Sequence, residues 1–555
     1  MSYGTPDGHP GHAPSYGDVT ARLPAQRAGY QTEELRVLLS LSRLEEENAY
    51  ECIPPLPQPD RIRVCERDRV SGTDYATPVE TRKVTPGALA ADYALPRVRY
   101  RGSFAPWLVC VSILLAGRML DHAYGLERQG PYLRGVFLVV LLLSVSFAVF
   151  QQLISWTDRP RRVTARQEQQ LEALRVVVAI PVYNEDPQLL DRAIWSLFNG
   201  SRLPHVIHVV EDGEQAVDYD LLRDHWTSRP GLEVIWTRNP VNQGKKWAQA
   251  DVFGSHPDAD IFITIDSDTA LEYEAIREGL KPFADKAVTS VAGIEVMYNA
   301  HKNWLTWSVT TRNIIYQLVT WGTQSAVGDL LVNRGTYALY RAWVIREIIP
   351  AYVGETFLGH QIKLGDDAAL ALFARGRGRT VQQVTAFCLP MCAETLSHHF
   401  RQFTRWMRGK AIRDEWRLRY LPLRSYGWLY TVFTIFTCLA STAGTIVLLA
   451  SLPSSLWLLR YSLTVMILAS LVTGTRVFCI QRSDESPWDR IISWLLYPTA
   501  LLWVLFVLRP LRFYGAATVF RQGWVTRQAG VEVAMEAAME HSPQTMMREP
   551  EEAIA

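Results

Sequence analysis

One contrast along the chain limits its fold more than any other feature. Residues 425–459 contain no charged side chain in 35 consecutive positions, whereas residues 170–420 are a polar, mixed block of about 250 residues. A helix needs about 20 mostly apolar residues to cross a bilayer, so the apolar run is long enough for one span and the start of a second. The sequence therefore predicts a water-exposed domain and membrane-crossing helices within one chain.

This pattern is extended by four further apolar stretches, at residues 104–120, 135–156, 461–475 and 491–508. Arginines precede the first stretch and follow the second. Because positive charge favours the cytoplasmic side, we expect these two stretches to form a hairpin with both ends in the cytoplasm. Arginines also lie on both sides of the last stretch, which contains Pro498. Two arrangements stay open there. In the first, residues 491–498 lie in the membrane interface, and residues 499–520 form either a span or a broken hairpin. In the second, the C-terminal tail lies outside the cell.

Charge balance and cysteine content exclude several classes of protein. The chain has 57 Lys and Arg against 56 Asp and Glu, for a net charge of +1, which excludes a strongly basic nucleic-acid-binding protein. Its seven cysteines are few, odd in number and scattered, so no disulfide framework is expected. We expect the polar block to work in the reducing cytosol.

The polar block alternates short runs rich in valine and isoleucine with longer helical segments. Three of the runs are residues 176–180, 206–210 and 261–265. Such alternation is typical of a parallel sheet covered by helices. Ligands bind at the carboxyl ends of the strands in open α/β sheets, so the predicted site lies where these runs end.

Polar residues near these strand ends are suited to a nucleotide. Tyr183 and Glu185 follow the first run, Asp212 follows the second, and Lys245 comes after an Asn-Gln-Gly segment further on. Carboxylates can hydrogen-bond a base or ribose, and a lysine can contact a phosphate. Any one of these clusters alone would be ordinary loop polarity, but three in order favour a binding site.

Asp266 and Asp268 follow the third run with a single residue between them. Two carboxylates spaced in this way at a strand end can point in the same direction and hold a hard divalent cation. Such a cation neutralises a diphosphate leaving group. The spacing alone is common by chance, so the weight of this prediction comes from its place after an apolar strand and the other clusters.

Asp366 and Asp367 supply a second pair of carboxylates, within Leu-Gly-Asp-Asp-Ala. Glycosyl transfer with inversion needs one general base to take the proton from the acceptor hydroxyl, and a carboxylate suits this role. Aspartate is also favoured at the start of a helix. The catalytic and the helix-capping interpretations are compatible, and both are kept.

Gln402, Arg405 and Trp406 lie on a basic helical stretch just before the long apolar run. Arg405 can pair with a diphosphate, and Trp406 offers an aromatic face to a sugar ring or a base. An amphipathic helix at the membrane interface would carry the same residue types, and we expect this helix to be one as well.

The order of these motifs resembles that of the processive, membrane-embedded family 2 glycosyltransferases, and most of all the hyaluronan synthases, within the chitin and cellulose synthase superfamily. The general resemblance rests on the clusters described above and covers roughly residues 100–528. The closer one rests on Glu355-Thr356-Phe357-Leu358-Gly359, Arg413-Asp414-Glu415-Trp416, Leu508-Arg509-Pro510-Leu511 and Gly523-Trp524-Val525-Thr526-Arg527.

This resemblance implies an α/β domain of the GT-A glycosyltransferase type, with a mixed, mostly parallel sheet, inserted between the transmembrane helices of a multi-pass plasma-membrane protein. It implies a cytosolic catalytic domain, UDP-sugar donors, Mg²⁺ or Mn²⁺, a growing polysaccharide acceptor and a lipid bilayer as partners, and no nucleic acid. The implied roles are nucleotide binding for Tyr183, Glu185, Asp212, Lys245 and Asp266, metal binding for Asp268, catalysis for Asp366 and Asp367, with Asp367 taking the acceptor proton, and acceptor and diphosphate binding for Gln402, Arg405 and Trp406.

The expected organisation follows from the apolar stretches and the motifs together. It comprises a mostly disordered cytoplasmic extension (1–100), two transmembrane helices (101–157), the cytosolic catalytic domain (170–396), amphipathic interface helices (397–424), three or four transmembrane or interface segments (425–520) and a tail (521–555).

The expected activity is that of an inverting, processive polysaccharide synthase that secretes its product, with hyaluronan made from UDP-GlcA and UDP-GlcNAc as the best match. The alternatives are a chitin, chito-oligosaccharide or cellulose-like homopolymer synthase and a non-processive membrane glycosyltransferase. Intact carboxylate pairs disfavour a transporter or scaffold with an inactive transferase domain. Residues 333–336 read Asn-Arg-Gly-Thr where the family usually has Ser-Gly-Pro, Gly213-Glu214 replaces Gly-Ser, and Ala368-Ala369 follows the second pair in place of a basic residue, which leaves the polymer open.

Overall fold

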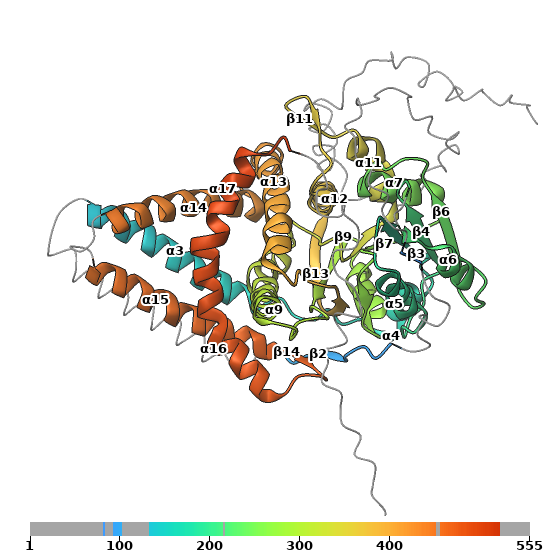
Figure 1. The fold of residues 1–555 in the computed structure, drawn as a ribbon, viewed down its shortest axis with the longest axis horizontal. Helices are drawn as coiled ribbons and strands as arrows, with labels where there is room; N and C mark the ends of the chain where they lie inside the picture. Colours follow the sequence, from blue (N-terminus) through green and yellow to red (C-terminus); the bar gives the residue numbers. More distant parts are fainter. Residues whose placement is uncertain (1–81, 84–92, 103–132, 215–216, 451–455, 522–555) are drawn as a thin grey trace, which may run out of the picture.

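The computed structural model describes residues 82–83, 93–102, 133–214, 217–450 and 456–521. Within them, an α/β domain carries a group of long helices that project from one side (Figure 1). The predicted span at residues 104–120 lies outside the described residues, as does most of the predicted N-terminal extension.

An eight-stranded mixed sheet forms the centre of the α/β domain. Its order is β6-β4-β3-β7-β10-β9-β13-β8, with parallel pairing among the first four strands and between β9 and β13, and antiparallel pairing at the other junctions. The strands are β6 Glu233–Arg238, β4 Val206–Glu211, β3 Val176–Val182, β7 Ile261–Ile265, β10 Tyr337–Arg341, β9 Val288–Glu295, β13 Arg379–Leu389 and β8 Ala270–Leu271. This confirms the mixed, mostly parallel sheet, and the three predicted runs are β3, β4 and β7.

Helices cover both faces of this sheet. They are α4 Ala165–Glu172, α5 Pro187–Phe198, α6 Asp220–Thr227, α7 Lys245–Ser255, α8 Ala275–Leu280, α9 Trp304–Tyr316, η5 Gln317–Trp321, α10 Gly322–Ala326, α11 Ala342–Val353 and α12 Asp366–Arg375. Val176 and Val178 of β3 pack in one core with α5, whereas Val177 packs in a second core with α7 and α11. Successive strand residues face opposite sides, so a strand covered on both faces is apolar throughout.

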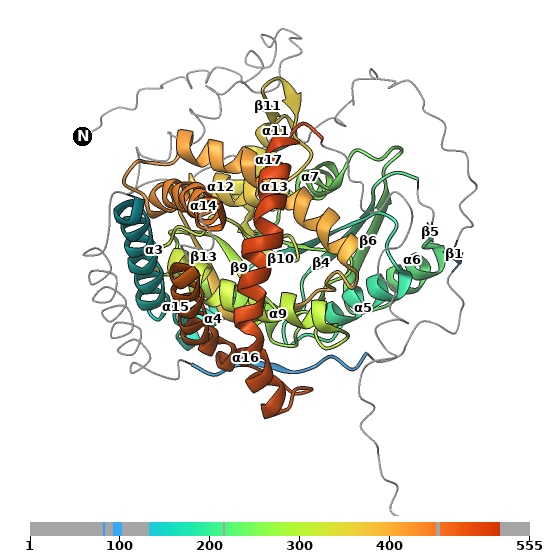
Figure 2. The ribbon, with the colours of Figure 1, turned by 60° about the vertical axis from the view of Figure 1, so that its left-hand side comes forward.

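Three long helices, α3 Leu133–Ser155, α14 Tyr426–Ala450 and α15 Leu456–Gly474, extend away from the α/β domain (Figure 1), and Figure 2 turns this side of the molecule toward the viewer. The predicted stretch at 135–156 is thus helical. In the described part of the chain, two helical runs are long and apolar enough to cross a membrane, Tyr426–Ile446 and Pro487–Ala517. The number of spans stays a prediction.

The second of these runs is one continuous helix. It consists of α16 Pro487–Trp503, the π-helical turn η7 Val504–Leu508 and α17 Arg509–Ala517. Because this helix is continuous, the broken hairpin over 499–520, one of the arrangements left open by the sequence, is wrong. A proline inside a helix removes one hydrogen bond but does not by itself make a turn. Both ends of this helix are followed or preceded by contacts with other segments. Before α16, β14 (Ile480–Arg482) pairs with β2 (Val98–Tyr100). Beyond α17, the Phe520 ring lies 5.0 Å from the His360 ring.

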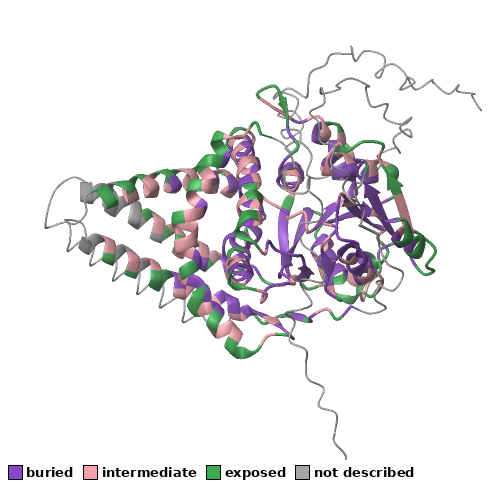
Figure 3. Cartoon of the chain, viewed as in Figure 1, coloured by how far each residue is buried: buried purple, intermediate pink, exposed green. Residues whose placement is uncertain are grey.

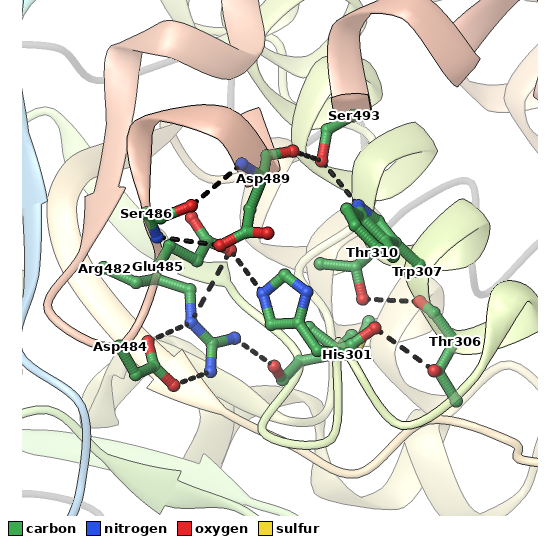
Figure 4. A network of polar contacts seen from close by, with 12 residues as sticks. His301, Thr306, Trp307, Thr310, Arg482, Asp484, Glu485, Ser486, Asp489 and Ser493 are labelled. Carbon is green, nitrogen blue, oxygen red and sulfur yellow. Dashed lines mark hydrogen bonds and ion pairs between the residues drawn. The ribbon is translucent and has the colours of Figure 1, made fainter. Parts of the chain in front are cut away.

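A polar junction joins the start of α16 to the loop before α9 (Figure 4). Arg482 is buried and donates a hydrogen bond to the backbone oxygen of Met297 at 2.5 Å. His301 Nε2 lies 3.0 Å from Glu485 Oε1. These contacts attach a long apolar helix directly to the loop that follows β9.

Candidate active site

A cavity of about 410 Å³ lies at the carboxyl ends of β3, β4 and β7. Every site residue predicted from the sequence lines it: Tyr183, Glu185, Asp212, Lys245, Asp266, Asp268, Asp366, Asp367, Gln402, Arg405 and Trp406. The structure therefore brings together side chains from strand ends, from two helix starts and from the helix before α14. The roles expected of them stay predictions.

Asp212 anchors the turn that leads into α7. Its carboxylate accepts hydrogen bonds from the backbone N–H groups of Gln243, at 3.0 Å, and Gly244, at 2.7 Å. Burial raises the pKa of Asp212, although these two N–H groups oppose the rise. The adjacent Gly213 has a φ of 87°, and a Cβ there would lie 2.2 Å from the backbone nitrogen of Asn242, so only glycine fits this close approach.

Glu185 holds the loop that carries the first pair of aspartates. Its carboxylate accepts a hydrogen bond from the Ser267 hydroxyl at 2.7 Å, and Ser267 lies between Asp266 and Asp268 in the sequence. The side chain of Glu185 is buried, so a well-made hydrogen bond to it is needed to offset desolvation. Glu185 thus sets where the two aspartates lie.

Lys245, the first residue of α7, connects the two pairs of carboxylates. Its Nζ lies 2.5 Å from Asp266 Oδ1 and 3.2 Å from Asp366 Oδ2. Burial disfavours the ammonium charge, but the two carboxylates outweigh it and raise the pKa of Lys245. A Cβ on Gly335 would come within 2.4 Å of this Nζ, so the glycine leaves the space that the lysine occupies.

Asp366 and Asp367 occupy the first turn of α12, after Gly365 in the left-handed conformation with a φ of 73°. Burial and the neighbouring Asp366 raise the pKa of Asp367 to about 6. Burial also opposes ionisation of Asp366, yet Lys245 holds the pKa of Asp366 below its usual value. The two aspartates therefore differ: Asp366 is an ionised partner of Lys245, and Asp367 is a carboxylate suited to accept a proton near neutral pH. The helix-capping interpretation is wrong, because Gly365 occupies the N-cap and no side chain caps this helix, although both aspartates do lie in its first turn, where the helix dipole favours them.

A buried ionic cluster fixes this turn to the rest of the domain. Arg413 donates to Glu355 Oε1 at 2.9 Å and to Oε2 at 2.7 Å, and Lys246 forms an ion pair with the same carboxylate. Arg413 also donates to the backbone oxygen of Gly365 at 3.2 Å. Sequence analysis found Glu355 and Arg413 only as parts of resembling motifs. Their partnership depends on three distant segments meeting, which no local pattern reveals.

The helix before α14, α13 Leu396–Tyr420, contributes Gln402, Arg405 and Trp406 to the cavity. It packs so closely on the turn before α12 that a Cβ on Gly409 would lie 3.4 Å from the backbone of Gly365. One face of α13 is therefore buried in the α/β domain, while Trp406 is 45% exposed. This helix belongs to the wall of the site.

Asp266 and Asp268 offer oxygen atoms that suit a hard divalent cation. The backbone oxygen of Asp268 accepts a hydrogen bond from Arg192 of α5 at 2.6 Å, which ties this loop to that helix. Among the residues that the structure describes, no three His, Cys, Asp or Glu side chains are grouped to enclose a metal. Mg²⁺ is commonly held by one or two carboxylates together with phosphate oxygens and water, so the donors present fit an ion bound along with a diphosphate.

Among the cavity residues that were not predicted as site residues are Glu295, Trp321 and Arg334. Glu295 is the last residue of β9, an acid after an apolar run, and it carries the same signal as the other strand-end carboxylates. Arg334 was noted only as part of a departure from the family pattern. Trp321 ends η5 and has no distinguishing signal of its own.

Comparisons with known proteins match the part of the chain that carries the strand-end residues of the cavity. Residues 177–348 match the family described as Glycosyl transferase family 2. A hyaluronan synthase of Streptococcus pyogenes is 30% identical over 359 residues, covering 64% of this chain and 83% of that protein. An N-acetylglucosaminyltransferase of Azorhizobium caulinodans is 26% identical over 360 residues, covering 64% and 88%, and one of Rhizobium meliloti is 24% identical over 378 residues, covering 67% and 86%.

Proposed function

The chain belongs to the family 2 glycosyltransferases and is a sugar-transferring enzyme, and from this premise we propose that it is an inverting, processive polysaccharide synthase that uses UDP-sugar donors. The observation that carries the proposal is the setting of Asp367. This buried carboxylate, with its pKa raised to about 6, lies in one cavity with the Asp266 and Asp268 pair and with Arg405 and Trp406. A general base, a cation-binding pair and an aromatic face for a sugar are what such a transfer requires.

In the proposed reaction, a hydroxyl of the acceptor attacks the anomeric carbon of the donor sugar from the face opposite UDP. Asp367 accepts the hydroxyl proton as the new carbon–oxygen bond forms. The bond to the diphosphate oxygen breaks, and its electron pair leaves with UDP, so the configuration at the carbon inverts. A cation bound at Asp268 would neutralise charge on the diphosphate. Lys245 and Arg405 line the same cavity and add positive charge to it.

The proposed product is hyaluronan, assembled from UDP-GlcA and UDP-GlcNAc. Its support is the similarity to a hyaluronan synthase along most of that protein. The second candidate is a homopolymer of the chitin or chito-oligosaccharide type, which the similarity to N-acetylglucosaminyltransferases favours.

We further propose that the enzyme is a multi-pass protein of the plasma membrane, with the cavity on the cytosolic side. The exposed apolar surface of α14 supports a lipid environment, since only 6% of its apolar stretch is buried by the protein. The arginines that flank the apolar stretches support a cytosolic catalytic domain.

The test supplies membranes containing the protein with labelled UDP-GlcNAc and UDP-GlcA, singly and together. The expected result is a polymer only when both donors are present, with the product degraded by hyaluronidase and resistant to chitinase and cellulase. Polymer from one donor alone would overturn the hyaluronan assignment. Release of UDP without polymer would overturn processive synthesis, and no release of UDP from either donor would overturn the UDP-sugar transferase itself.

A further inference from the structure

Arg334 lines the cavity beside the catalytic pair, yet the transfer proposed above gives it no task. It lies in the loop before β10, in the same cavity wall as Asp366 and Asp367. The loop Asn333-Arg334-Gly335-Thr336 is where the sequence departs from the Ser-Gly-Pro of the resembling family. None of the three family residues carries a charge, so Arg334 adds a cation to this part of the cavity wall.

Two groups hold the guanidinium of Arg334 in place. Its Nη1 forms an ion pair with Glu295, and its central carbon lies 4.5 Å from the centre of the Trp321 ring. Glu295 is itself fixed, since it accepts hydrogen bonds from Thr336 Oγ1 at 2.5 Å and from Asn313 Nδ2 at 2.9 Å. A planar cation held by a carboxylate and an indole is oriented before any ligand arrives, so little further conformational entropy is lost on binding.

The ion pair uses only one corner of the guanidinium. Within the described parts of the chain, Glu295 is the one ion-pair partner of Arg334, and it meets Nη1. The Nε and Nη2 edge of an arginine carries two parallel N–H donors, spaced to match the two oxygens of a carboxylate. The side chain is 21% exposed, so a carboxylate bound along this edge would be largely shielded from water.

The charges around the cavity make this edge important for an anionic sugar. Asp266, Asp366 and Asp367 line the same space, and a sugar carboxylate entering it would meet like charge. Lys245 is already paired with two of these aspartates. Burial lowers the pKa of Arg334 to about 10, with Asp367 opposing the fall, so the guanidinium is still charged at neutral pH.

We propose that Arg334 determines the sugar specificity of the cavity by binding the carboxylate of a uronic acid unit through its Nε and Nη2 edge. The inference rests on the proposed function, because it names the class of sugar that the same cavity handles. The carboxylate could be carried by the nucleotide-sugar donor or by the end of the acceptor chain, and the chemistry of recognition is the same. Neutral sugars present hydroxyl groups only, and these bind a guanidinium less strongly than a carboxylate does.

The experiment compares ligands that differ only in the carboxylate. In the donor arm, purified full-length protein with Mn²⁺ is titrated calorimetrically with UDP-glucuronic acid and with UDP-glucose. In the acceptor arm, UDP is present, and the ligands are an oligosaccharide that ends in glucuronic acid and its methyl ester. We expect wild-type protein to prefer the acid by about tenfold in one arm, the value of a charge-assisted hydrogen bond. Arg334→Gln should bring that ratio close to one.

Two controls separate specificity from folding. The double variant Glu295→Gln/Arg334→Gln removes both members of the ion pair and leaves no unpaired buried charge, and it should lose the preference as well. Arg379→Gln removes a surface arginine that is 3.2 Å from Asp285, and it should keep the wild-type ratio.

A wild-type ratio near one in both arms would overturn the inference, as would a preference that survives in Arg334→Gln. Measuring UDP release on the same preparations keeps this failure distinct from failure of the proposed function. Protein that releases UDP but does not discriminate the acid remains a transferase without an assigned role for Arg334. Protein that releases no UDP from any donor contradicts the proposed function.

Discussion

Strand β3 and helix α14 are both strongly apolar, yet the protein covers only the first (Figure 3). The residues from Val176 to Ile180 are completely buried. In α14, Leu439 is 55% exposed and Ile446 is 62% exposed. Apolar side chains that no protein covers require another apolar environment, and we infer that lipid supplies it. The difference between the two regions is therefore in what buries them.

The two regions also differ in how they treat charge. The α/β domain buries Glu355, Arg413 and Lys246 as one mutually paired cluster. The apolar stretch of α14 contains no charged residue. The α/β domain can use charge for chemistry because its hydrogen bonds offset desolvation, whereas a lipid-facing helix has no such partners.

The largest expected effect is on catalysis. Asp367→Asn removes the proposed base, and sugar transfer should fall by about 10² to 10⁴-fold, while donor binding and membrane association are retained. UDP release measures sugar transfer, calorimetry with UDP-sugar measures donor binding, and sedimentation of membranes measures membrane association. Asp285→Asn, on the surface of the same domain, should leave all three unchanged. Sugar transfer at the wild-type rate in Asp367→Asn would refute the assigned base.

The next effect concerns the buried ionic cluster. Glu355→Ala leaves Lys246 and Arg413 buried without their carboxylate, which should destabilise the α/β domain by about 3–5 kcal/mol. Its matched control is Asp258→Ala, which breaks a 2.6 Å ion pair with Arg175 in which the side chains are 58% and 35% exposed, at a cost below about 1 kcal/mol. Thermal unfolding followed by tryptophan fluorescence measures the loss of stability in the two variants. Equal losses in the two variants would mean that Glu355 does not organise the turn before α12.

A third comparison tests the lipid environment of α14. Leu439→Lys should weaken membrane insertion by about 2.5–3.5 kcal/mol, because it places a charge where lipid is inferred. Leu221→Lys, at a site in α6 that is 46% exposed, should change stability by only about 0.5 kcal/mol. Alkaline extraction of membranes separates inserted from peripheral protein. An extraction profile of Leu439→Lys that matches wild type would mean that water, or another protein, covers this face.

The smallest effect is on the pH profile. A base must be unprotonated to accept a proton, and the pKa of Asp367 is raised to about 6, so kcat/KM should decline as the pH falls through this value. The decline should reach about tenfold between pH 7 and pH 5. Initial rates of UDP release across this range provide the measurement. The residual activity of Asp367→Asn should lack this step, and a wild-type profile that is flat down to pH 5 would exclude Asp367 as the titrating base.

Much of the fold and of the cavity could be predicted because their signals are local. β3, β4 and β7 are apolar runs that end in polar residues, and strand ends meet at one edge of a sheet. The contacts of Lys245 could not be predicted, because Asp266 and Asp366 approach it only after the chain has folded. Pro498 suggested an interruption, but the surrounding apolar residues continue one helix through it. Long-range pairing and helix continuity depend on tertiary packing, which sequence patterns report only indirectly.

The central claim is that a buried transferase site and a lipid-embedded bundle act together to make a polymer and export it. The most direct measurement reconstitutes the full chain in liposomes, supplies both labelled donors from outside, and follows protease-resistant, high-molecular-weight label. Enzyme molecules whose cavity faces the outside of the liposome should export the polymer into the interior. Hyaluronidase added outside should therefore degrade the polymer only after detergent opens the vesicles. Label that is fully degraded without detergent, or UDP release with no polymer, would contradict the account.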